Sequence, residues 1–144
     1  MKIFLNILLA ATFFLQFHLK ATAQGFNSVY SKDGISVIAS GNNGNVFRSY
    51  DGCLNFLSFS IGSVNLNSIV NFNNTIIITG NSGIIYYSTN DGSTWNNQTL
   101  GTQNINSISF ADANTGWAVG DGGTIYKSNI ILNTKEFFYF SKFS

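Results

Sequence analysis

From residue 24 onward, the apolar residues fall in short segments that are rich in Val, Ile, Phe, Tyr and Thr. Gly, Asn, Asp and Ser separate these segments, and none of them continues with the spacing of an amphipathic helix. This pattern is typical of β-strands joined by tight turns. In the middle of the chain it predicts four strands, near residues 68–72, 75–80, 83–89 and 94–100.

The segments recur with a period of about 40 residues. A strand that ends in glycine closes at Gly41, Gly80 and Gly120, at spacings of 39 and 40 residues, and matching Asn-Ser pairs lie upstream. Four short antiparallel strands in about 40 residues form one blade of a β-propeller. We therefore predict an all-β fold with about three four-stranded propeller blades in an incomplete ring. A β-solenoid or a β-sandwich is the alternative. The predicted repeats cover residues 26–65, 66–104 and 105–144, the last of them degenerate.

A polar turn joins the third and fourth strands of the second repeat. Its residues are Ser88-Thr89-Asn90-Asp91-Gly92-Ser93-Thr94-Trp95. The short side chains of Ser88 and Asn90 are suited to hydrogen-bonding turn amides, Gly92 accepts a positive φ, and the Trp95 ring can pack over the turn. In the first repeat the turn covers residues 49–56, where Ser49, Asp51 and Phe56 match and the glycine, Gly52, comes one position early.

This turn resembles the Asp-box, or BNR repeat, with the pattern S-x-D-x-G-x-T-W, in which Ser88, Gly92, Thr94 and Trp95 match and Asn90 replaces the aspartate. The whole unit is similar to the repeat of photosystem II stability and assembly factor propellers, most specifically at residues 117–120 and 123–126. Sortilin-type and sialidase-type propellers share the box. The resemblance implies a non-catalytic propeller that offers a surface for protein or glycan contacts.

The N-terminal segment has the features of a secretory signal peptide. Lys2 precedes an apolar run of roughly 15 residues, and Ala21-Thr22-Ala23 supplies small residues for cleavage. The run is short of the roughly 20 residues that span a bilayer. We therefore predict a signal peptide at residues 1–23, a mature chain at residues 24–144, no stable membrane insertion, and a secreted or periplasmic location.

Composition narrows the chemistry of the mature chain. Only 9% of residues are charged, and removal of the signal peptide takes away the sole histidine. One cysteine remains, so no intramolecular disulfide can form, and no Ser-His-Asp or imidazole metal site can be built. A single arginine and scattered lysines provide no basic stripe for nucleic acid. We predict no cofactor, no metal and no nucleic-acid partner.

The carboxylates give the remaining candidates for a site. Asp33 and Asp112 occupy equivalent loop positions 79 residues apart, so they are candidates for a ligand-facing rim, with turn formation as the simpler interpretation. A sialidase needs a cluster of arginines, which this chain lacks. A glycoside hydrolase needs two carboxylates that flank one bond. Asp33 with Asp112 is the only pair at matching repeat positions, and we assign no catalytic residue.

The third repeat loses its pattern after Ser128, and closed propellers have four to eight blades. We therefore predict a piece of a longer propeller. Completion by several chains and a small open stack of sheets are the alternatives, and open blade edges would allow self-association. The predicted function is a secreted, non-catalytic module for protein or glycan interaction or scaffolding. The alternative is a carbohydrate-active propeller, that is, a glycoside hydrolase with Asp-box repeats.

Overall fold

The computed structural model describes residues 25–112, 115–129 and 139–143, which form three four-stranded antiparallel sheets. The first contains β1 (Phe26–Ser31), β2 (Val37–Gly41), β3 (Asn45–Ser49) and β4 (Leu57–Ser60). The second contains β5 (Leu66–Phe72), β6 (Thr75–Gly80), β7 (Ile84–Ser88) and β8 (Asn96–Thr99). The third contains β9 (Ile105–Phe110), β10 (Thr115–Gly120), β11 (Ile125–Asn129) and β12 (Tyr139–Phe143).

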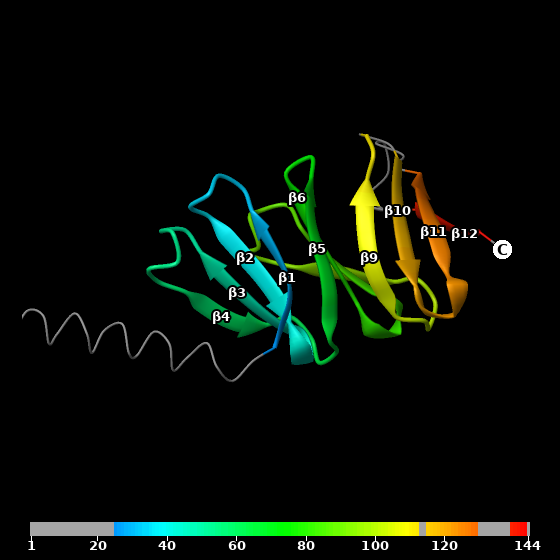
Figure 1. The fold of residues 1–144 in the computed structure, drawn as a ribbon, viewed down its shortest axis with the longest axis horizontal. Helices are drawn as coiled ribbons and strands as arrows, with labels where there is room; N and C mark the ends of the chain where they lie inside the picture. The colour runs from blue at the N-terminus through cyan, green and yellow to red at the C-terminus, as the bar shows by residue number, and fades with distance from the viewer. Residues whose placement is uncertain (1–24, 113–114, 130–138, 144) are drawn as a thin grey trace, which may run out of the picture.

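Each sheet is a simple meander whose strands pair in the order of the chain. Figure 1 shows the three sheets side by side, with the first at one end and the third at the other. The first strands of successive sheets are neighbours, because β1 contacts β5 and β5 contacts β9. This stacking of meanders is the arrangement of propeller blades. The predicted all-β fold, with about three four-stranded repeats in an open array, is confirmed.

Alternation along the strands builds a separate core between each pair of sheets. The core between the first and second sheets includes Ile38, Val46, Leu66, Ile69 and Tyr86. The core between the second and third sheets includes Ile77, Ile85, Ile105, Ile108 and Tyr126. Because the middle sheet contributes apolar side chains to both cores, its strands β6 and β7 are buried on both faces. This explains the nearly continuous apolar run Ile76-Ile77-Ile78.

The Gly-rich segments between the second and third strands of each sheet form single 3-10 turns, η1 (Asn42–Gly44), η2 (Asn81–Gly83) and η3 (Asp121–Gly123). A glycine is required at Gly44, where φ is +71° and an added Cβ would lie 2.2 Å from the carbonyl oxygen of Gly62. The turns η1 and η2 therefore lie close against the linker to the following sheet, Gly44 against Gly62 and Gly83 against Gly101.

The third sheet is more complete than the sequence indicated. The expected loss of the repeat after Ser128 does not end the sheet, since Tyr139–Phe143 pairs with β11 as a fourth strand, with Ser128 opposite Phe140. The sequence pattern did not predict this strand, because no polar turn like those at residues 49–56 and 88–95 precedes it. The segment is also richer in aromatic residues than the other strands. The predicted signal peptide at residues 1–23 and the carboxylate Glu136 lie outside the described residues.

Candidate functional site

The turn between β7 and β8 is held by the side chains that the sequence singled out. The Ser88 hydroxyl accepts a hydrogen bond from the backbone N–H of Gly92 at 2.9 Å and donates to Oδ1 of Asn90 at 2.9 Å. The same Oδ1 accepts from the N–H of Thr94 at 2.9 Å, and the Trp95 indole donates to the carbonyl of Gly92 at 3.1 Å. Ser88 and Asn90 thus accept hydrogen bonds from the N–H groups of the turn.

The turn between β3 and β4 repeats this network. The Ser49 hydroxyl accepts from the N–H of Cys53 at 3.0 Å, and Oδ1 of Asp51 accepts from the N–H of Asn55 at 2.9 Å. The backbone N–H of Asn55, followed by the side chains of Asn55 and Ser49, holds the pKa of Asp51 below its usual 3.8. The early glycine leaves the backbone path unchanged, since Gly52 and Cys53 have φ of 67° and 69°, and Asp91 and Gly92 have 53° and 77°.

The aromatic position of the turn differs between the two sheets. Trp95 is half-buried and packs against the core between the first and second sheets. Phe56, at the equivalent position of the first sheet, is exposed, and its ring centre lies 6.5 Å from that of Phe47. A phenyl ring has no N–H, so the indole bond of the second turn has no counterpart at this position.

Asp33 and Asp112 both close the loop between the first two strands of their sheets. Oδ1 of Asp33 accepts from the N–H groups of Ile35 and Ser36 at 2.9 and 2.5 Å. These bonds lower the pKa of Asp33 below 3.8, the Ser36 amide contributing most. Oδ1 of Asp112 accepts from the N–H of Thr115 at 2.9 Å. The two aspartates lie in the first and third sheets with the second sheet between them, so they do not meet at one site.

A cavity of about 200 Å³ lies at the junction of the first and second sheets. Its lining combines aromatic, charged and apolar side chains: Tyr30, Lys32, Asp33, Ser36, Ile38, Tyr50, Ile76 and Asp91. Asp33 is therefore at the edge of a cavity, but with Asp91 rather than with Asp112. This cavity is the candidate site.

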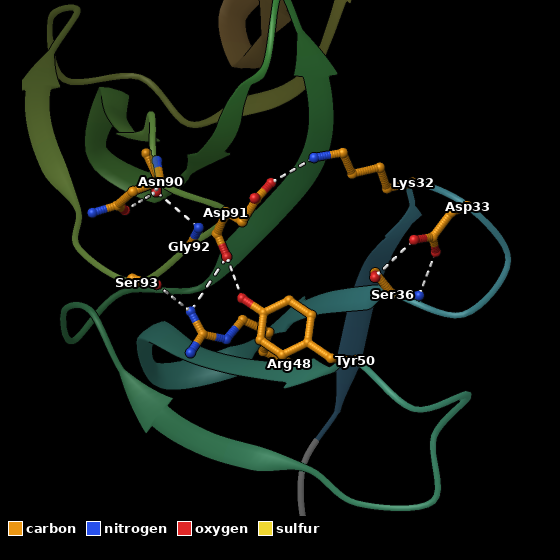
Figure 2. A network of polar contacts seen from close by, with 10 residues as sticks. Lys32, Asp33, Ser36, Arg48, Tyr50, Asn90, Asp91, Gly92 and Ser93 are labelled. Carbon is orange, nitrogen blue, oxygen red and sulfur yellow. Dashed lines mark hydrogen bonds and ion pairs between the residues drawn. The ribbon is translucent and has the colours of Figure 1, made fainter.

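Asp91 connects the two sheets at the mouth of this cavity (Figure 2). Its carboxylate pairs with Nζ of Lys32 at 3.0 Å, and its backbone carbonyl accepts from the Tyr50 hydroxyl at 3.0 Å and from Nη1 of Arg48 at 3.3 Å. Arg48 also donates to the Ser93 hydroxyl at 3.0 Å, and its guanidinium carbon lies 4.9 Å from the centre of the Tyr50 ring. The hydrogen bond and charge of Asp91 raise the pKa of Lys32 above 10.5.

The sequence pattern did not indicate that these residues meet. Lys32 and Asp91 are 59 residues apart, and Arg48 is 43 residues from the carbonyl that it contacts. The signal that could have found them is the repeat itself, because stacked repeats place the β1–β2 loop of one sheet near the β7–β8 turn of the next. Only the register between sheets, which a single sequence does not show, identifies the partners.

Two kinds of feature are absent from the described residues. Within them, no three His, Cys, Asp or Glu side chains are grouped so that they could hold a metal ion. In the same part of the chain there is no helix of the length and apolar character that crossing a membrane requires.

Comparisons with known proteins identify the architecture. No protein-family model matches the chain, and no curated protein sequence matches it. Among solved structures, YCF48 bound to a D1 peptide is similar with a TM-score of 0.64 and 18% identity, over 74% of this chain and 38% of that one. An ancestral GH74 enzyme is similar with a TM-score of 0.61 and 18% identity, over 83% of this chain and 20% of that one. The chain thus spans well under half the length of either protein, and the three sheets are blades of a β-propeller.

Proposed function

We propose that this chain is an exported, non-catalytic interaction module that binds a protein or a glycan through the propeller blades. The β3–β4 and β7–β8 turns are assigned as Asp-boxes. In each turn, a buried serine and a following Asp or Asn accept the turn amides in the same pattern. Asn90 supplies the acceptor oxygen that an aspartate would supply, so the box keeps its hydrogen bonds without the charge.

The observation that carries the non-catalytic assignment is the use of the carboxylates as turn acceptors. Asp33, Asp51 and Asp112 each accept backbone N–H groups of their own loop, and Asp121 accepts the side-chain amides of Asn104 and Asn106. A general acid in a glycosidase needs a raised pKa. The pKa values of Asp33 and Asp51 are instead lowered, which favours permanently ionised, structural carboxylates.

The cavity between the first and second sheets supports a binding role. Its two tyrosines provide flat apolar faces and hydroxyls, and Lys32 and Asp91 provide exposed charges of both signs at its mouth. Such a lining suits a short segment of a polar ligand. The YCF48 structure is described with a bound peptide, so a peptide is the first ligand class to test, and a glycan is the second.

The test combines binding with turnover. The secreted chain is screened against peptide and glycan arrays, and ligands are confirmed by calorimetry with Lys32→Ala and Tyr50→Ala. We expect binding that both variants weaken at least about tenfold, since each removes a side chain from the cavity mouth. Lys142→Ala is the matched control, because this exposed lysine belongs to the third sheet. Equal affinity of all variants would contradict the assigned cavity.

Turnover distinguishes the module from the alternative, a glycoside hydrolase. A panel of chromogenic glycosides should give no product above the uncatalysed rate. Hydrolysis that disappears in Asp33→Asn would replace the proposed function with the carbohydrate-active one.

A further inference from the structure

The two interfaces between sheets share one pattern of residues. We call the side of a sheet that faces the next sheet along the chain its trailing face, and the opposite side its leading face. The trailing faces of the first and second sheets contribute Val46 and Ile85, at equivalent positions. The leading faces of the second and third sheets contribute Ile69 and Ile108, also at equivalent positions. Each internal interface therefore joins the same trailing and leading positions.

The trailing face of the third sheet has the same apolar positions but no sheet on it within the described residues. Ile125 is equivalent to Val46 and Ile85, and it is 41% exposed where both of those are fully buried. Val119 and Trp117, at neighbouring positions of β10, are exposed as well. Val119 takes the place of Ser40 and Thr79, whose buried hydroxyls lack hydrogen-bond partners, so this position is more apolar than on the two covered faces. Lys127 lies on the same face, with Nζ 5.3 Å from the centre of the Trp117 ring.

The leading face of the first sheet also exposes apolar residues at positions that are buried in the other sheets. Val29 is equivalent to Ile69 and Ile108, and it is 65% exposed where those residues are 6% and 4% exposed. Phe26 replaces the fully buried Leu66 and Ile105 of the other sheets and is also exposed. Its ring centre lies 4.6 Å from that of Phe47 in an edge-to-face contact, which extends the apolar surface of this face.

An asparagine side chain forms a hydrogen bond across each internal interface. Nδ2 of Asn27 donates to the carbonyl of Leu66 at 2.8 Å, and Nδ2 of Asn67 donates to the carbonyl of Ile105 at 3.0 Å, each across an interface. Each amide also donates to a side-chain oxygen of its own sheet. Asn106, the third member of the series, makes the second kind of bond, to Asp121 at 2.7 Å. In the described part of the chain, the Asn106 amide has no acceptor across an interface. The equivalent acceptor would be a backbone carbonyl at the Phe26 position of a following blade.

We propose that the chain associates head to tail with a second copy of itself, the trailing face of the third sheet docking on the leading face of the first sheet of the partner. The internal interfaces already show that these positions pack together. One chain carries both faces, so two copies can form two identical interfaces, and the pair closes into a ring if the rotation between successive blades completes a full turn over two chains. Two copies supply six blades, within the range of four to eight found in closed propellers. Exposed apolar patches of this kind mark interaction surfaces.

The test uses the chain as an exporting host releases it, and measures its mass in solution by light scattering and sedimentation. We expect a dimer. A monomer at all concentrations, or an open series of larger species, would overturn the proposal. Val29→Asp and Ile125→Asp each place a carboxylate on one docking face, and each should raise the dissociation constant about 100-fold or more. Both residues are exposed in the single chain, so far-ultraviolet circular dichroism should show an unchanged fold.

Mixing the two variants tests the head-to-tail geometry. In a mixed pair, one interface combines the intact trailing face of Val29→Asp with the intact leading face of Ile125→Asp. Native mass spectrometry should therefore detect a heterodimer, although each variant alone is monomeric. Its absence, or a dimer of either variant alone, would contradict head-to-tail docking. Leu57→Asp is the control, because Leu57 is also exposed but pairs with Arg48 on the trailing face of the first sheet, which is not a docking face. That variant should remain dimeric, and its dissociation would show that any added charge suffices.

Discussion

Removing the Ser88 hydroxyl tests whether the side-chain network holds the β7–β8 turn. Ser88 is 1% exposed, and its hydroxyl accepts a hydrogen bond from the N–H of Gly92, a residue that is itself buried. In Ser88→Ala this N–H has no acceptor and little access to water, at a cost of about 1 to 3 kcal/mol. The bond that Ser88 donates to Asn90 is lost as well, a net contribution of about 1 kcal/mol. We therefore expect the free energy of unfolding to fall by about 2 to 4 kcal/mol.

Urea unfolding followed by circular dichroism and tryptophan fluorescence measures this loss, provided that both probes give the same transition. Thr89→Ala is the matched control, since this neighbouring side chain is exposed and its truncation should change the free energy by about 0.5 kcal/mol or less. Ser49→Ala should cost less than Ser88→Ala, because the amide that loses its acceptor belongs to the half-buried Cys53. Equal stability of Ser88→Ala and Thr89→Ala would refute the reasoning.

Three further outcomes follow from the same contacts. Trp95→Ala should lower the free energy of unfolding by about 2 to 4 kcal/mol, because it removes a half-buried ring and its hydrogen bond, whereas Asn90→Asp should be within about 1 kcal/mol of wild type; urea melts decide both. The lowered pKa values of Asp33 and Asp51 mean that the unfolded chain binds more protons in acid. The urea midpoint should therefore be constant above about pH 5 and fall below it, less so in Asp33→Asn and Asp51→Asn, and a midpoint independent of pH would contradict this. Intact mass of the secreted protein should correspond to a chain that begins at Gln24, and a product that retains the predicted signal peptide would exclude that cleavage.

The blades could be predicted from the sequence because each strand and turn is marked by residues that are close together in the chain. Each strand is a short apolar segment, each Gly-rich turn lies within a few residues of it, and the period of about 40 residues repeats both. The predicted strand at residues 75–80 agrees with β6 (Thr75–Gly80). The strand β12 was missed, since Tyr139–Phe143 follows a segment without the polar turn that marks the equivalent strand β8.

The candidate cavity was predictable only in part, for a related reason. Asp33 was identified from its repeat position, and in the structure it accepts hydrogen bonds from N–H groups of its own loop. Lys32, Tyr50 and Asp91 have no repeat counterparts that would draw attention to them, because charged and aromatic side chains vary among the loops of the three repeats. They meet because adjacent blades are stacked, and the stacking depends on the packing of Ile38 and Ile76 beneath them.

The displaced glycine of the β3–β4 turn shows which contact determines the shape of this turn and of the β7–β8 turn. Both turns need two successive residues with positive φ, Gly52 with Cys53 in one and Asp91 with Gly92 in the other. A residue with a Cβ pays roughly 1 to 2 kcal/mol for the left-handed region, and each turn contains one such residue and one glycine. Moving the glycine by one position therefore leaves the total strain nearly the same. The hydroxyl of the preceding serine accepts an amide four residues later in both turns, so this contact, rather than the glycine, sets the path of the chain.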